Sequence, residues 1–289
     1  MSWESSLTRL VAAELVEPVN PQITAMAAAL AARHPGAARA VLFYGSCLRE
    51  SQLDGLMLDF YLIVSDYRAA YGKSWLAAAN RLIPPNVFPF ECGGLIAKYA
   101  VLSTADFHRL NGPETRNVSV WARFAQPSRL VWAADDAAQA RAVCAVARAA
   151  PTLLAAAGAI DGEAPLDWWR RAFALTYSAE LRAERTSRAG SVVDADADRY
   201  QRFGPPAMAE IPLDARGGGW PLRRLQGKAL SVIRLAKAAF TYAGGIDYLA
   251  WKINRHAGTK IEIASWMRRW PLVAALVLVP KLLARGAVR

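Results

Sequence analysis

The residues best suited to do chemistry in this sequence stand close together in "VLFYGSCLRESQLDGLMLDFYLIV", from Val41 to Val64. Gly45 and Ser46 follow a short apolar run, and such a Gly-Ser turn offers backbone N–H groups and a hydroxyl to phosphate oxygens. Asp59 lies within the next apolar run, where a buried carboxylate is costly unless it is paired or binds a cation. The stretch therefore predicts a site for phosphate groups and Mg²⁺, both of which nucleotidyl transfer needs.

The position two residues after Asp59 is informative because alternate residues of a strand share a face. A pair of carboxylates at this spacing would hold the metal together, but the second position here is Tyr61. Either the second carboxylate comes from another part of the chain, or Asp59 has a structural role, such as capping a turn or pairing with an arginine. The stretch alone leaves both interpretations open.

Hydrophobic periodicity predicts an α/β fold for the N-terminal part of the chain. Much of residues 1–35 is expected to be helical, as are 65–83, which form one helix, and 104–110, with Thr104 as the cap. Strands are expected at 38–46, 56–64, 86–91 and 94–103, with an edge strand at 129–132. The strand of Asp59 is apolar enough to be covered on both faces, and we expect the strand that ends at Glu91 to neighbour it.

The sequence after residue 133 predicts mainly helices, over 135–159, 165–184 and 225–258. The segment 200–224 is rich in Gly, Pro and Arg and predicts a loop or a mobile flap. We therefore expect three parts, an α/β domain at 1–133, a helical domain at 134–265 and an amphipathic tail at 266–289.

Composition limits the class of protein and its partners. The chain has 289 residues, 54% of them hydrophobic and 20% charged, which argues against disorder. Its 35 basic and 24 acidic residues give a formal charge of +11, which favours an anionic partner. Three widely spaced cysteines predict neither a disulfide framework nor a metal site, and favour an intracellular location.

The C-terminal tail predicts contact with a membrane surface. Its apolar run, 271–279, is too short to span a bilayer and is interrupted by Pro280 and Lys281. Basic residues flank the run on both sides, as in interfacial anchors. The alternative is an ordinary helix that packs on the core.

Four sequence blocks occur in a fixed order: "FYGSCLRES…LMLDFYLIVSD", "GLIAKYAVLSTADFHR", "VWARFAQPSRLVW" and "ALTYSAELRAE". Together, over roughly residues 38 to 200, they resemble the mitochondrial translocator-assembly-and-maintenance type of phosphatidate cytidylyltransferase, a CDP-diacylglycerol synthase. The resemblance implies a nucleotidyltransferase-like domain with a mixed sheet, then a helical, winged-helix-like domain. It implies a cytoplasmic enzyme, peripheral on the inner face of the cell membrane, that uses Mg²⁺ to convert CTP and phosphatidate to CDP-diacylglycerol and pyrophosphate.

The same resemblance implies roles for individual residues. That family carries an apolar residue where this chain has Tyr61, so the tyrosine is no sign of decay. Glu180 stands where a block carries Asp, which makes it the leading candidate for the second metal ligand and catalytic carboxylate beside Asp59, with Glu91 as another candidate ligand. Lys98 is implied as a catalytic residue that also contacts the triphosphate. The residues implied to bind CTP are Tyr44, Gly45, Ser46, Lys98, Arg123 and Arg182.

The phosphatidate site is predicted among basic residues interspersed with apolar and aromatic ones, which suit a headgroup and its acyl chains. These residues are Arg234, Lys237, Lys252 and Arg255. An alternative is a nucleotidyltransferase that acts on a non-lipid acceptor, a small molecule or an RNA end. A nucleic-acid-binding protein without activity is disfavoured because no RNA-binding module is present, and we expect no nucleic-acid partner.

Overall fold

The computed structural model describes residues 5–50, 52–53, 55–158, 162–180, 188–212, 217–241, 263–265 and 267. The predictions made for Arg182, Lys252 and Arg255 lie outside these residues. So does the predicted tail at 266–289, apart from Met267. The three-part division of the chain and the membrane contact of the tail therefore stay predictions.

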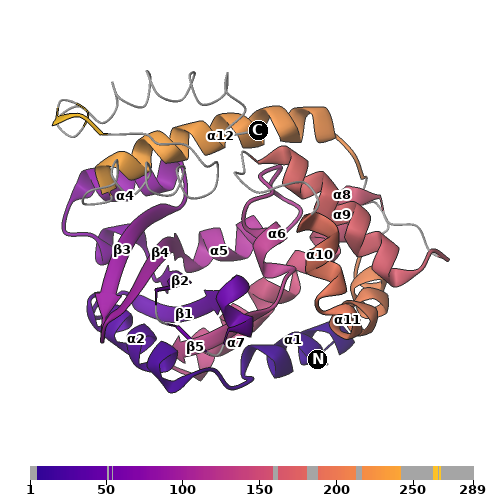
Figure 1. Ribbon diagram of the computed structural model, residues 1–289, viewed down its shortest axis with the longest axis horizontal. Coiled ribbons are helices and arrows are strands. Elements are labelled where there is room, and N and C mark those ends of the chain that lie inside the picture. The colour runs from indigo at the N-terminus through magenta and orange to yellow at the C-terminus, as the bar shows by residue number, and fades with distance from the viewer. Residues whose placement is uncertain are drawn as a thin grey trace.

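A five-stranded mixed sheet forms one side of the molecule (Figure 1). Its strands are β1 (Ala38–Tyr44), β2 (Met57–Val64), β3 (Asn86–Cys92), β4 (Leu95–Ser103) and β5 (Ser128–Ala133). They lie in the order β3-β4-β2-β1-β5, and β2 and β4 are parallel while the other neighbours are antiparallel. The predicted strands, including β5 as an edge strand, are confirmed, and the fold is mixed α/β of the α+β kind.

Helices cover both faces of the sheet and form the rest of the described structure. They are α1 (Ser6–Leu15), α2 (Pro21–Ala32), α3 (Tyr67–Ala70), α4 (Ser74–Leu82), α5 (Thr104–Asn111), α6 (Trp121–Phe124), α7 (Asp136–Ala147), α8 (Ala149–Ala157), α9 (Pro165–Ala179), α10 (Arg188–Asp194), α11 (Ala197–Ala209) and α12 (Trp220–Thr241), with a short 3₁₀ helix, η1 (Ser46–Arg49). In the part of the chain that the structure describes, no strand follows β5. The winged-helix-like detail therefore stays a prediction.

Strand β2 is buried on both faces, as its apolar sequence predicts. Phe60 and Leu62 belong to a hydrophobic cluster with residues of α2 and α4. Tyr61 and Ile63, on the opposite face, belong to a second cluster with residues of α1, α5, α7 and α9. This second cluster joins the sheet to the helices that follow residue 133, so both parts share one core.

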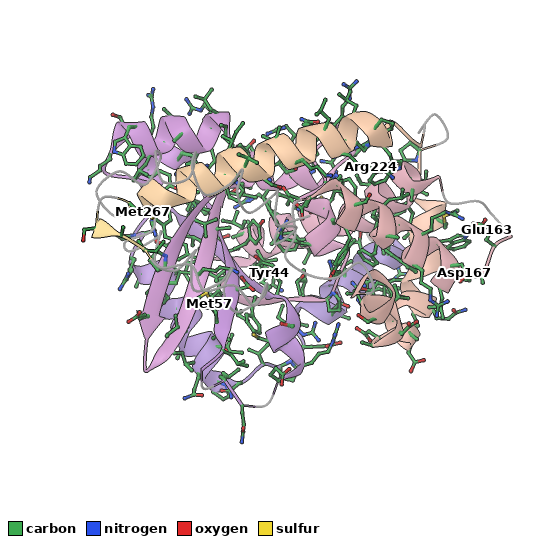
Figure 2. All side chains as sticks on the ribbon, turned by 45° about the horizontal axis from the view of Figure 1, so that its top comes forward. Tyr44, Met57, Glu163, Asp167, Arg224 and Met267 are labelled. Atoms are coloured by element: carbon green, nitrogen blue, oxygen red, sulfur yellow. The ribbon has the colours of Figure 1, made fainter. Side chains whose placement is uncertain are left out.

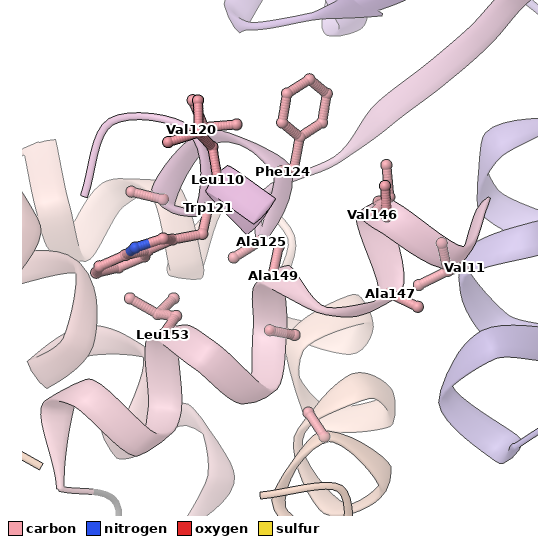
Figure 3. Close-up of a cluster of buried hydrophobic side chains, with 14 of the residues drawn as sticks. Val11, Leu110, Val120, Trp121, Phe124, Ala125, Val146, Ala147, Ala149 and Leu153 are labelled. Atoms are coloured by element: carbon pink, nitrogen blue, oxygen red, sulfur yellow. The ribbon is translucent and has the colours of Figure 1, made fainter. Parts of the chain in front are cut away.

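Part of that shared core lies where α6, α7 and α8 meet (Figure 3). The indole of Trp121 is fully buried and faces Leu153 of α8, while Val11 of α1 approaches Val146 and Ala147 of α7. Burial of large apolar side chains of this kind contributes roughly 1.5–3 kcal/mol each. The short helix α6, which carries Arg123, is thereby held on a rigid base.

Three local predictions were wrong. The segment 65–83 forms two helices, because Tyr71, extended and buried, separates α3 from α4. Ser103 caps α5, accepting a hydrogen bond from the backbone N–H of Asp106, and Thr104 is the first helical residue. Residues 200–209 belong to α11 although Pro205 and Pro206 lie inside it, so no loop spans 200–224.

Among the described residues, one stretch, Asp136–Ala157, is long and apolar enough to cross a membrane, and 67% of its most apolar window is buried inside the fold. The stretch comprises α7 and α8, which contribute to the core described above.

Candidate functional site

Three polar side chains predicted to act together are direct neighbours on three adjacent strands. Tyr44 at the end of β1 pairs in register with Asp59 of β2, and Asp59 pairs with Lys98 of β4. Side chains in register on neighbouring strands share a face, so these three form one row across the sheet. Figure 2 labels Tyr44 between the sheet and the helical part of the molecule.

The chain leaves β1 through Gly45, whose backbone has φ 97° and ψ −170°, a conformation that favours glycine. A Cβ at this position would lie 3.4 Å from Asp59 Oδ2, so the residue also brings the backbone close to the carboxylate. Ser46 follows at the start of η1 and is exposed. The turn therefore brings its backbone close to Asp59, and the exposed Ser46 follows it directly.

Asp59 and Lys98 form an ion pair, with 3.0 Å between Lys98 Nζ and Asp59 Oδ1. Their side chains are 24% and 25% exposed, so the pair is reached by solvent. Asp59 Oδ1 itself is buried and accepts no directed hydrogen bond from the described residues. The pair explains how the carboxylate is tolerated on an apolar strand, and a cation bound at Oδ1 would replace the Lys98 ammonium group there.

A second ion pair joins α6 to the end of α9, with 3.4 Å between Arg123 Nη1 and Glu180 Oε1. Arg123 also donates a hydrogen bond to the backbone carbonyl of Ser119. Burial works to lower the pKa of Arg123, but the negative charge of Glu180, with contributions from Tyr61, Tyr44 and Asp59, outweighs burial and raises it. Arg123 therefore lies within electrostatic reach of both carboxylates and is fixed in its charged form.

Helix α12 brings a further cation to the same place. Arg234 Nε donates to the carbonyl of Pro84 at 3.0 Å, and its Nη1 donates to Ser119 Oγ at 3.0 Å. Among the described residues its Nη2 has no hydrogen-bond partner, although the atom is buried. Burial lowers the pKa of Arg234, and Arg123 lowers it further. Ser119 thus holds two guanidinium groups, one through its carbonyl and one through its hydroxyl.

Lys237, one turn further along α12, donates hydrogen bonds to the carbonyls of Ile83 and Pro85. Burial, followed by the charge of Arg234, lowers its pKa to about 7. Its contacts attach the end of α12 to the segment between α4 and β3. In this structure Lys237 therefore has a positioning role, and its predicted contact with a substrate headgroup stays a prediction.

Helix α12 also crosses the end of α9 at very close range. A Cβ at Gly227 would lie 2.1 Å from the carbonyl oxygen of Ala179, the residue before Glu180. Arg224 Nε donates to Ser178 Oγ at 3.1 Å next to this crossing. The crossing fixes α12 against the segment that carries Glu180.

Tyr61 does not take the place of a metal ligand. Its ring is buried and lies 5.2 Å from the ring of Tyr44 and 5.1 Å from that of Phe124, centroid to centroid. Burial raises the pKa of its hydroxyl, and so do the nearby carboxylates, Glu180 before Asp59. The phenol therefore stays neutral, and its ring packs in an aromatic cluster with Tyr44 and Phe124.

The predicted position of Glu91 is wrong, because β4 lies between β3 and β2. Glu91 is exposed and pairs with Ile96, two residues away from the row of Asp59 and Lys98. Two strand spacings and two residue rises place it about 12 Å from Asp59. A shared metal ion would need ligands at about 2 Å, so the direct partnership expected of Glu91 and Asp59 is not supported.

The structure thus brings together most of the residues predicted for the site. These are Tyr44, Gly45, Ser46, Asp59, Lys98, Arg123, Glu180 and Arg234. Sequence reasoning missed Ser119 and Gly227. Ser119 lies in the loop before the "WARF" motif, and Gly227 stands alone inside a helical pattern, where a glycine usually has a packing reason.

The described residues suit a Mg²⁺ ion that shares its ligands with substrate phosphates, and they do not suit one held by protein side chains alone. The described residues contain no group of three or more His, Cys, Asp or Glu side chains placed to hold a metal. Mg²⁺ is nevertheless commonly bound by one or two carboxylates together with substrate phosphates. Asp59, a single carboxylate beside the Gly45 turn that already has a cation, Lys98, as its partner, suits this second mode.

No protein-family model matches the sequence, and no curated protein sequence matches it either. Assignment to a family therefore depends on the four sequence blocks and the geometry of the site, and it is made as a proposal.

Proposed function

We propose that this protein is a Mg²⁺-dependent nucleotidyltransferase that transfers a cytidylyl group from CTP to phosphatidate. The observation that carries the proposal is the row of Tyr44, Asp59 and Lys98 beside the Gly45 turn. One carboxylate, one ammonium group and a glycine turn converge there on one face of the sheet. This combination is what binding of a metal-complexed triphosphate requires.

Each residue has a role that follows from its contacts. The Gly45 turn and the Ser46 hydroxyl bind phosphate oxygens, and Asp59 holds the metal together with those phosphates. Bound Mg²⁺ would neutralise charge on the α-phosphate and on the leaving pyrophosphate. Lys98, released from its ion pair with Asp59 once the metal neutralises that carboxylate, binds the triphosphate as a point charge.

Arg123 stabilises the leaving group. Its guanidinium stays charged over the whole accessible pH range, and two fixed partners, Ser119 and Glu180, orient it. A preoriented cation costs no reorganisation when charge develops on the pyrophosphate. We propose that Glu180 acts through Arg123 as a positioning residue.

The acceptor is a phosphate monoester in this scheme. One of its oxygens attacks the α-phosphorus, a new P–O bond forms, and the bond between the α- and β-phosphates breaks to release pyrophosphate. The attacking oxygen already carries negative charge, so positioning dominates and no strong general base is required. Arg234, within electrostatic reach of Arg123 and Glu180 and held by Ser119, is the cation assigned to that acceptor phosphate in this scheme.

The test uses CTP labelled on the α-phosphorus, Mg²⁺ and phosphatidate dispersed in detergent. The proposal predicts labelled CDP-lipid with release of one pyrophosphate per lipid formed. Formation of label in a water-soluble product with another acceptor would show a nucleotidyltransferase for a small molecule or RNA end. No transfer to any acceptor would refute the proposal.

A further inference from the structure

In the part of the chain that the structure describes, the exposed large apolar side chains are concentrated on two helices. Among the described residues, seven large hydrophobic side chains are exposed, and five of them lie on α4 and α12. These five, which we call the α4/α12 face, are Trp75, Leu82, Leu222, Leu225 and Ile233. Leu82 and Leu225 are 80% and 69% exposed. Single exposed apolar residues are ordinary, but such a concentration marks an interaction surface.

The periodicity of α12 separates this face from the side that packs on the protein. Leu222, Leu225 and Ile233 lie on the outer side, at helical spacing. Gly227 and Arg234 lie on the inner side, where one contacts α9 and the other binds Pro84. The outer side of α12 is therefore exposed, while its inner side packs on α9 and on Pro84.

Helices α4 and α12 belong to one surface. The hydrogen bonds from Arg234 to the Pro84 carbonyl and from Lys237 to the Ile83 carbonyl attach α12 directly beyond the end of α4. Both helices lie along the same edge of the molecule in two views (Figures 1 and 2). The end of α4 that carries Leu82 therefore adjoins α12.

The charge of this surface has one sign only. Neither α4 nor α12 contains an Asp or Glu residue. Exposed basic side chains border the apolar ones, namely Lys73 and Arg81 at the two ends of α4 and Lys228 on α12. Apolar side chains bordered by cations suit a surface of anionic lipid, which offers both acyl chains and phosphate charge.

We propose that the α4/α12 face is the surface by which this protein lies on an anionic lipid membrane. The inference rests on the proposed function, because it places the substrate-bearing bilayer on the outer side of the helix whose inner side carries Arg234. It is separate from the predicted contact through residues 266–289. Insertion of Trp75, Leu82 and Leu225 into the headgroup region supplies the apolar part of the affinity, and Lys73, Arg81 and Lys228 supply the part that depends on lipid charge.

The test is sedimentation of the full-length protein with vesicles of phosphatidylglycerol and phosphatidylcholine, compared with phosphatidylcholine alone. A triple variant, Trp75→Ser, Leu82→Ser and Leu225→Ser, removes the apolar part. Val16→Ser is the matched control, since Val16 is 60% exposed at the end of α1, away from this face. We expect the triple variant to bind the anionic vesicles at least about tenfold more weakly, and the control to bind like wild type.

A second pair of measurements separates this inference from the proposed function. Transfer to detergent-dispersed phosphatidate should be unchanged in the triple variant, because none of the three residues contacts the site. Absence of transfer in the wild type would refute the proposed function and leave the vesicle result unaffected. Equal vesicle binding by wild type and triple variant would overturn the inference.

Two other outcomes would also overturn it. Wild-type protein that dimerises in sedimentation equilibrium, with a monomeric triple variant, would assign the face to a second copy of the chain. Protection of the Leu222, Leu225 and Ile233 side chains from carbene labelling without vesicles would show that the chain itself covers the face in solution.

Discussion

The close contact between Gly227 and Ala179 allows the position of α12 to be tested by adding one methyl group. A Cβ on residue 227 would lie 2.1 Å from the Ala179 carbonyl oxygen, where contacts shorter than 3.0 Å are essentially never found. Gly227→Ala therefore requires the two helices to separate by about 0.9 Å at this point. Neither backbone can yield locally without moving the residues that follow it.

The displacement can be followed to the site. Arg234 lies two turns beyond Gly227 on the same side of α12, and its two hydrogen bonds, to Pro84 and Ser119, are each 3.0 Å long. A rigid shift of the helix would stretch both to about 3.9 Å, beyond hydrogen-bond range. Misplacement of a binding group by about 1 Å can reduce a rate by about 100-fold. We expect Gly227→Ala to lower kcat/KM for transfer to phosphatidate by about 10- to 100-fold.

The effect on stability is smaller because two terms oppose each other. Alanine is favoured over glycine inside a helix by about 1 kcal/mol. Overpacking a close contact costs typically about 1–3 kcal/mol. The net loss of unfolding free energy should therefore be at most about 2 kcal/mol, and the folded variant can be assayed.

The assay compares Gly227→Ala with Gly72→Ala at a temperature where both variants are folded. A Cβ at Gly72 would meet no atom within 4 Å, and that glycine has no positive φ, so this control should keep wild-type activity. If Gly227→Ala has wild-type kcat/KM and an unchanged or raised Tm, the close contact is refuted, because α12 then does not pack on the Ala179 carbonyl. Full activity with lowered stability would separate α12 from catalysis.

Three further variants test other parts of the structure. Glu180→Gln should raise the KM for CTP by about tenfold and leave the Mg²⁺ requirement unchanged, because Glu180 contacts Arg123; a raised Mg²⁺ requirement in a metal titration would assign Glu180 to the metal instead. Arg199→Met leaves the buried carboxylate of Glu14 without its ion pair and should lower the unfolding free energy by about 3–5 kcal/mol in urea denaturation; a loss below about 1 kcal/mol would contradict the pairing. Lys237 has a pKa of about 7 in the folded protein, against an ordinary value of 10.5, so between these pH values the unfolded chain binds one more proton than the folded protein. The wild-type protein should therefore gain stability relative to Lys237→Met as the pH rises through this window. A stability difference that does not depend on pH would show that burial does not lower the pKa of this amine.

Much of the sheet could be predicted from the sequence because its signals are local. Each strand is an apolar run bounded by turn residues, and Gly93 and Gly94 adopt the positive φ that the turn between β3 and β4 requires. The order of the strands has no local signal. The placement of β4 between β2 and β3 follows from the parallel pairing of β2 and β4, and for this reason the position of Glu91 was predicted wrongly.

Helix α11 shows why a composition rich in Gly and Pro was misleading. Its stability comes from long-range contacts, since Arg199 pairs with Glu14, which is 185 residues away in the sequence, and Tyr200 is fully buried. These contacts offset the backbone hydrogen bonds lost at Pro205 and Pro206. Tertiary packing of this kind cannot be recognised from the segment alone.

The site was predictable in part for the same reasons. Gly45 and Asp59 belong to one local motif, and the sequence blocks pointed to Lys98, Arg123 and Glu180. The contact between Arg123 and Glu180 joins residues 57 apart, and Ser119 acquires its role only because α12 returns across the sheet. Such contacts are properties of the fold.

The most direct test of the account is the rate of CDP-lipid formation by Asp59→Asn compared with Glu91→Gln, both with labelled CTP, Mg²⁺ and phosphatidate. Asparagine keeps the shape of the side chain and removes the charge that would hold the metal, whereas Glu91 is exposed and remote from the row of Tyr44, Asp59 and Lys98. We predict a loss of at least about 1,000-fold for Asp59→Asn, roughly 4 kcal/mol of transition-state stabilisation, and wild-type activity for Glu91→Gln. CDP-lipid formation by Asp59→Asn at the wild-type rate would contradict it.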